Sequence, residues 1–113
     1  MTAPAAIRSW ESKRTSETKE VEKLLRKKFQ RVDCYRYNSA SIRVRVIDES
    51  FDGLPREKRD SLVEKQLQLL PSETQRDIVT LLTFAPSELI KTSKSFREFM
   101  LNTEFEDPSP SLL

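Results

Sequence analysis

The chain has 113 residues, of which 36% are hydrophobic and 34% charged, and its formal net charge is +2. This length supports one domain with a single core that needs no disulfide or metal. With no histidine, one cysteine and one glycine, the sequence excludes an internal disulfide, a CxxC metal site and the glycine-rich phosphate loops of the Walker, Rossmann and GxxG types.

The same composition bears on localisation. No apolar run approaches the length of a membrane span, and the first residues lack the apolar stretch of a signal peptide. A single cysteine fits a reducing compartment. We therefore expect a cytoplasmic protein without membrane contact; the alternative is an organelle transit peptide, suggested by alanine, serine and arginine near the start.

The basic residues are concentrated in the front half of the chain. From Lys19 to Arg45 there are nine basic residues and three acidic ones, an excess of six, whereas 98–107 holds four acidic residues and no basic one. A helix is expected over 18–31, where apolar residues recur at three- and four-residue steps. Its basic end suits either a solvated helix terminus or a binding surface.

Residues 32–47 predict a β-hairpin around the turn residues 38–41. We expect the pairing to turn Tyr35 and Tyr37 toward the core. The opposite face would then carry four side chains: Cys34, Arg36, Arg43 and Arg45. Three arginines beside a thiol suit an anion or a nucleic-acid backbone and would lower the pKa of the thiol. The alternative is a solvated sheet face with an incidental cysteine.

The stretch 41–63 organises the rest of the chain, because it runs from strand through turn to helix without a break. Gly53 is expected to take a positive φ, and Pro55 to open a helix that ends near Leu70. A short helical turn with a capping box should follow at 72–75. A third strand is expected over 78–84, apolar on both faces, after a connection long enough for a parallel crossover.

A last helix is expected from Ser95, with Phe96, Phe99 and Met100 on the face that packs against the domain. The elements together predict an α+β fold in the order α-β-β-α-α-β(-α), with a three-stranded sheet packed against helices. The expected domain covers 16–104. Residues 1–15 should be a flexible N-terminal segment and 105–113 a disordered tail.

Part of the sequence resembles the BolA family. Phe51-Asp-Gly53, then Arg59, then Leu62-Val63 resemble that family's Phe-x-Gly, Arg, Leu-Val pattern, and 78–86 resemble its last strand, ending in aromatic-x-Pro. The resemblance covers about 21–89 and implies the BolA-like layout, which is shared with class II KH domains.

The resemblance also implies a function. BolA-like proteins that share an iron–sulfur cluster with monothiol glutaredoxins carry a histidine just before the last strand and a second ligand on the first loop between strands. Here the histidine position falls near Asp77, and the loop is only 38–41. The resemblance therefore implies an adaptor in redox or iron homeostasis with a glutaredoxin-type partner, while the missing ligands predict no cofactor or metal.

Two functions follow from the sequence. The first is a non-catalytic adaptor that binds a protein partner, since no spacing marks a nucleophile or an acid–base pair and an enzyme is not expected. The alternative is a nucleic-acid-binding module, in which arginines on the strands alternate with tyrosines. The candidate binding residues are Cys34, Arg36, Arg43, Arg45 and Asp77.

Overall fold

The computed structural model describes residues 9–90 and 96–110. The elements, in chain order, are the 3-10 helix η1 (Ser9–Lys13), α1 (Ser16–Leu25), β1 (Arg31–Asn38), β2 (Ser41–Ile47), the 3-10 helix η2 (Glu49–Phe51), α2 (Arg56–Leu67), α3 (Ser72–Asp77), β3 (Ile78–Phe84), α4 (Pro86–Ile90) and α5 (Phe96–Glu106). The α+β class and the third strand, with both of its expected bounds, are confirmed.

The three strands form one mixed sheet in the order β1-β2-β3. β1 and β2 are antiparallel and joined by the two-residue turn 39–40, whereas β2 and β3 are parallel. The chain between β2 and β3 carries α2 and α3, which confirms the expected crossover. β3 is an edge strand of this sheet.

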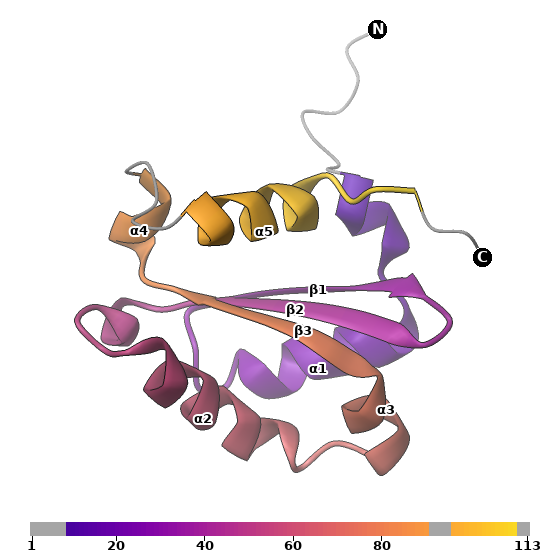
Figure 1. Ribbon diagram of the computed structural model, residues 1–113. Helices are drawn as coiled ribbons and strands as arrows, with labels where there is room; N and C mark the ends of the chain where they lie inside the picture. Colours follow the sequence, from indigo (N-terminus) through magenta and orange to yellow (C-terminus); the bar gives the residue numbers. More distant parts are fainter. Residues whose placement is uncertain (1–8, 91–95, 111–113) are drawn as a thin grey trace, which may run out of the picture.

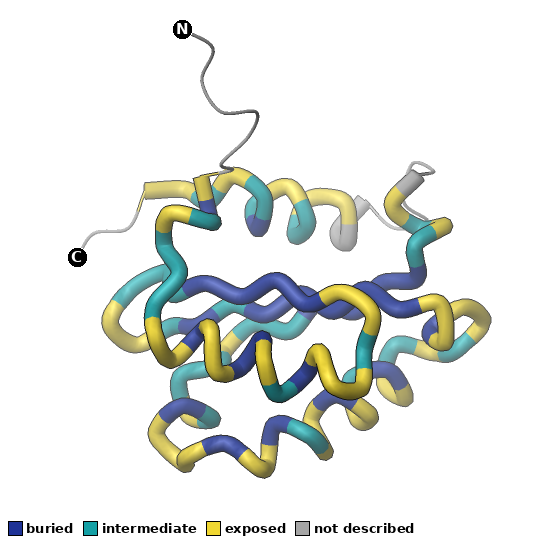
Figure 2. The backbone as a smooth tube through the Cα atoms, turned by 180° about the vertical axis from the view of Figure 1, so that it is seen from behind, coloured by how far each residue is buried: buried dark blue, intermediate teal, exposed yellow. Residues whose placement is uncertain are grey.

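Helices lie on both faces of the sheet (Figure 1). On one face α1, α2 and α3 cover a core of aliphatic side chains together with Phe51. On the other face η1 and α5 cover a second, smaller core: Trp10, Tyr35, Ile47, Leu82, Phe84 and Phe105. Figure 2 shows the strands as a mostly buried layer between these covers.

Local contacts set the ends of the first helix. α1 begins after Thr15, whose side chain and that of Thr18 form a reciprocal capping box. The helix was expected to reach residue 31, but it ends at Leu25. The turn that follows is fixed by two hydrogen bonds: Arg26 Nη2 donates to the Val32 carbonyl at 2.9 Å, and the Gln30 N–H to Asp48 Oδ2 at 2.9 Å.

The turn before α2 agrees with the sequence. Gly53 has a φ of 79°, which confirms the positive value expected there. Arg59, the arginine of the BolA-like pattern, donates to the Leu54 carbonyl at 2.9 Å and forms two hydrogen bonds, of 2.7 and 2.9 Å, with the carboxylate of Glu88. The buried arginine therefore ties the turn and α2 to α4, a helix that the sequence did not predict.

The ends of the chain differ from expectation. Trp10, in the segment expected to be flexible, is buried within η1. Phe105 was expected in a disordered tail, but it lies on α5 and is buried, because its ring packs against Tyr35 with ring centres 4.9 Å apart. On α5 it is Leu101 and Phe105 that pack inward, whereas Phe99 and Met100 are about half exposed.

A smaller correction concerns α3 and the last helix. α3 follows Pro71 without any side-chain cap hydrogen bond, so the capping box expected at 72–75 is absent from it. The side chain of Phe96, expected on the packing face of the last helix, lies outside the described part of the chain.

Candidate functional site

The four side chains expected on one sheet face are divided between the two faces. Cys34 pairs with Val44 and Tyr35 with Arg43. The hairpin is therefore shifted by one residue from the expected pairing, which set Tyr35 opposite Val44. Because neighbouring residues of a strand point to opposite faces, this shift moves Cys34 and Arg36 to the side of α1. A β-bulge between Arg36 and Asn38 accompanies the two-residue turn. The expected shared patch is therefore wrong.

Arg43 and Arg45 lie beneath α5. Arg45 is 1% exposed, and it bonds to Asp33 on β1, to Asn102 at 2.9 Å and to Glu106 at 3.0 Å. Its guanidinium carbon lies 4.6 Å from the ring centre of Phe105. Arg45, which was expected to suit an external anion, thus has its charge compensated within the fold.

Arg43 has a similar internal role nearer the hairpin turn. Its Nη1 donates to the Tyr35 hydroxyl at 2.9 Å and to Glu104 on α5 at 3.2 Å, and its guanidinium stacks over the ring of Tyr37. Burial raises the pKa of Tyr35. Both tyrosines therefore belong to the contact between the sheet and α5, not to an open stacking surface.

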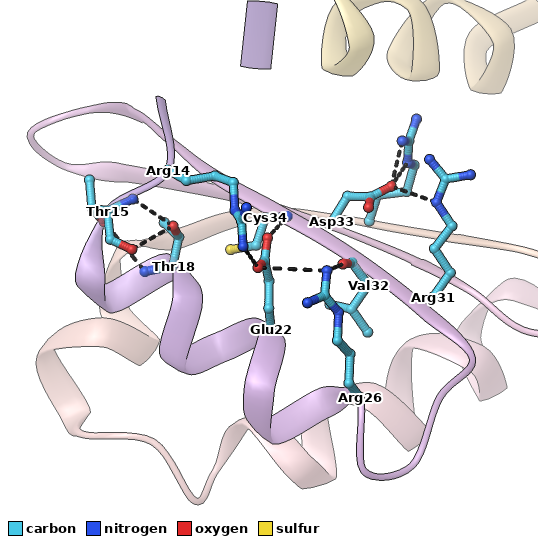
Figure 3. Close-up of polar contacts among 10 residues, drawn as sticks. Arg14, Thr15, Thr18, Glu22, Arg26, Arg31, Val32, Asp33 and Cys34 are labelled. Carbon is cyan, nitrogen blue, oxygen red and sulfur yellow. Dashed lines mark hydrogen bonds and ion pairs between the residues drawn. The ribbon is translucent and has the colours of Figure 1, made fainter. Parts of the chain in front are cut away.

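Cys34 lies on the opposite face, against α1 (Figure 3). Its backbone N–H donates to the carboxylate of Glu22 at 3.3 Å, and Glu22 is itself buried and paired with Arg14 and Arg26. Burial, and then the charge of Glu22, raise the pKa of the thiol well above its ordinary value. The lowered thiol pKa expected from the sequence is wrong, because burial and the Glu22 carboxylate outweigh the lowering effect of Arg14 and Arg36.

Arg36 and Asp77 are brought together. The carboxylate of Asp77 accepts from Arg36 Nη2 at 3.2 Å, and the same guanidinium bonds to Glu17 on α1 and to the Ser39 carbonyl at 3.1 Å. This pair fixes the end of α3 to the hairpin. It lies apart from Arg45, which is on the other sheet face.

These residues do not fit the iron–sulfur cluster that the resemblance implies. Cluster iron is held by thiolates or imidazoles, whereas Cys34 is a buried thiol with a raised pKa and Asp77 is a carboxylate already paired with arginine. Among the described residues, no three His, Cys, Asp or Glu side chains are grouped so as to hold a metal ion.

A groove that the sequence did not predict runs along the open edge of β3. Its volume is about 570 Å³. α2 forms one wall through Asp60, Glu64 and Leu67, and Leu101 of α5 contributes to the other. β3 lies between them, and Val79 is 62% exposed there. Apolar side chains of three elements thus surround the outer edge of the sheet.

A second groove, of about 450 Å³, lies over α1 and is strongly basic. Five cationic side chains and one carboxylate line it: Arg14, Lys19, Lys23, Arg26, Lys27 and Glu22. For the basic end of the first helix, the sequence allowed a solvated terminus or a binding surface, and this groove is the place where a binding surface would lie.

Within residues 9–90 and 96–110, no helix is both long and apolar enough to cross a membrane.

Comparison with known proteins addresses the fold. No protein-family model matches the chain, and no curated protein matches its sequence. A solved structure, BolA1 from Arabidopsis thaliana, is similar with a TM-score of 0.52 and 18% sequence identity, over 66% of this chain and 96% of that one. The match includes nearly all of BolA1 and leaves about a third of this chain outside it. The resemblance seen in the sequence is thereby confirmed at the level of structure: the chain has a BolA-like fold.

Proposed function

We propose that the protein is a non-catalytic adaptor that binds a protein partner through the groove along β3. The observation that carries the proposal is an edge strand left open between α2 and α5, with Val79 exposed in a groove of about 570 Å³. A wide, partly apolar surface at a sheet edge is suited to another polypeptide.

The BolA-like fold directs the choice of the first partner to test. By resemblance, the adaptor acts in redox or iron homeostasis and binds a glutaredoxin-type protein. The proposal concerns contact between proteins and needs no shared cluster, since Cys34 and Asp77 are poor ligands. A single buried cysteine agrees with a reducing cytoplasm.

The experiment compares two lysine substitutions at exposed apolar residues. Val79→Lys places a charge in the groove, whereas Leu69→Lys changes a residue that is 71% exposed and does not line the groove. Binding of a purified monothiol glutaredoxin, and of proteins that copurify with the native chain, is measured by calorimetry. We expect Val79→Lys to weaken binding at least tenfold and Leu69→Lys to leave it unchanged. Equal binding by all three chains would contradict the proposal.

The basic groove over α1 favours a second candidate, the binding of nucleic acid. The strand face proposed from the sequence is covered by α5 at Arg43 and Arg45. Lys19 and Lys23 are exposed on α1, however, and Lys27 is exposed in the turn that follows it. Lysines four residues apart repel one another on a helix, so their clustering suits an anionic partner.

This candidate is tested with a fluorescent single-stranded oligonucleotide at increasing salt. Lys23→Glu should weaken binding and flatten the dependence on salt, whereas Lys65→Glu, a charge reversal on the exposed side of α2, should do neither. The absence of detectable binding at low salt would exclude it.

A further inference from the structure

The chemistry of β3 distinguishes it from most edge strands. Ile78–Phe84 contains no charged residue, proline or glycine, and four of its seven residues are β-branched. Natural proteins usually protect such an edge with charges, with proline or with a covering element, because its unpaired N–H and C=O groups would otherwise pair with another chain. An edge strand with a purely structural role would usually carry a charge or a proline, and β3 carries neither.

The direction of the backbone shows which part of the edge is open. The Phe84 carbonyl accepts the Asp48 N–H at 3.0 Å, so Phe84 is turned toward β2. Because the backbone groups of a strand alternate in direction, Thr83 and Leu81 are turned toward the open edge. Arg59 already donates to the Thr83 carbonyl at 3.3 Å. In the described part of the chain, a further strand would therefore meet the N–H and C=O of Leu81 and the N–H of Thr83.

The two sides of the groove differ in chemistry. On the side of α2, Leu67 and Leu81 are apolar and Glu64 is exposed at the rim. The other two charges of that wall are paired, since Arg56 Nε lies 3.7 Å from Asp60. On the side of α5 the described lining is Leu101 with Leu82 and Thr80 of β3, and none of these three residues is charged. One face of a strand placed here would meet an apolar surface on the side of α5. Its other face would meet the apolar side chains of Leu67 and Leu81, with the carboxylate of Glu64 at the rim.

From this we propose that the groove binds an extended peptide segment as a fourth strand on β3, with apolar residues turned toward α5 and lysine or arginine turned toward α2. A long cationic side chain suits the α2 side because its methylene stem covers Leu67 and Leu81 while its charge meets Glu64. This inference rests on the proposed function and adds the mode of binding and the chemistry of the bound segment.

The probe is a fluorescein-labelled nonapeptide of alternating valine and lysine, with a matched valine–glutamate peptide as control. We expect the lysine peptide to bind at least tenfold more tightly, and amide hydrogen exchange at Leu81 to slow when it is bound. Glu64→Lys should reverse the preference between the two peptides. Equal affinities, or a preference that Glu64→Lys leaves unchanged, would overturn the assignment of the cationic face.

Strand addition is tested separately by N-methylation. Two further lysine peptides carry N-methyl groups, one at every lysine and the other at every valine. Since alternate N–H groups of an added strand point at β3, one of these peptides should lose binding at least tenfold and the other should retain it. Equal behaviour of the two would overturn strand addition.

The outcomes also separate this inference from the proposed function. If no peptide binds at millimolar concentration while Val79→Lys still abolishes binding of a partner protein, strand addition is wrong and the adaptor function stands. If peptides bind but no partner protein does, the adaptor function fails. A dimer in sedimentation equilibrium that Val79→Lys dissociates would make a second copy of the chain the occupant and overturn the inference.

Discussion

Arg45 and Asp33 stand directly opposite each other on β2 and β1, and their side chains form an ion pair buried beneath α5. Asp33 Oδ2 also accepts from Arg31 Nε at 3.1 Å. The far side of the Arg45 guanidinium reaches Asn102 and Glu106, so one cation joins two strands and the last helix. This contact explains why the second sheet face is closed although its strands carry arginines.

Asp33→Ala should destabilise the protein by about 3 kcal/mol, because a buried guanidinium loses its closest carboxylate. The free energy of unfolding is measured by urea titration, followed by the fluorescence of the single tryptophan. Glu20→Ala, at an exposed position on α1, is the control and should change stability by less than about 0.5 kcal/mol. Equal losses for the two variants would show that the pair contributes nothing beyond an ordinary surface charge.

Arg59→Lys should cost about 2 kcal/mol, since an ammonium cannot reproduce the two parallel bonds to Glu88 together with the bonds to the Leu54 and Thr83 carbonyls. Arg56→Lys is the matched control, because Arg56 is more exposed and, among the residues that the structure describes, its ion pair is a long i,i+4 contact with Asp60. We expect that control to change stability by less than about 0.5 kcal/mol. If Arg59→Lys is equally mild, the buried network is not structural.

Acidification should loosen α5 through Glu104. Burial alone would raise the pKa of this carboxyl, but hydrogen bonds from Ser109 and Arg43 outweigh burial and lower it. With the pKa lower in the folded than in the unfolded chain, the stabilisation is present above the unfolded pKa and is lost as the pH falls through the folded one.

The change is followed between about pH 5 and pH 2, a range that begins just above the ordinary glutamate pKa. Trp10 fluorescence reports it, because the indole packs on Phe105 with ring centres 5.5 Å apart. The native chain should lose stability over this range more steeply than Glu104→Gln does. Parallel pH profiles would contradict the prediction.

Cys34 should be unreactive in the folded protein. The thiol is fully buried and its pKa is raised, so very little thiolate is present at neutral pH. Alkylation by iodoacetamide, measured by mass spectrometry, should be negligible in native buffer and complete in urea. Rapid alkylation of the native chain would show that the strand opens locally, and would restore the thiol as a candidate reactive group.

The sequence predicted where the strands and turns lie better than it predicted which face of the sheet each side chain is on. The apolar run at 78–84 and the turn at Gly53 were located correctly, because strand propensity and positive φ are local properties. On β1 the tyrosines were expected to face the main core, but that face is occupied by Val32 and Cys34. With both faces of the sheet covered, the alternation of side chains on β1 does not show which face meets which core.

The candidate site was missed for a related reason. A strand that is apolar on both faces has the same pattern at the edge of a sheet as at its centre, so the sequence does not reveal that β3 has an open side. The basic groove over α1 was visible as a charge run. The groove itself depends on the fold, because Arg14, before α1, and Arg26, at its end, both pair with Glu22.

Segments from both ends of the chain meet over the second face of the sheet: the Ser9 hydroxyl donates to Asp107, and the Trp10 indole N–H to Glu106. The ring of Phe105 on α5 also packs against the indole, with ring centres 5.5 Å apart. Burial of Trp10 is therefore coupled to the docking of α5, and loss of that helix would expose η1 as well.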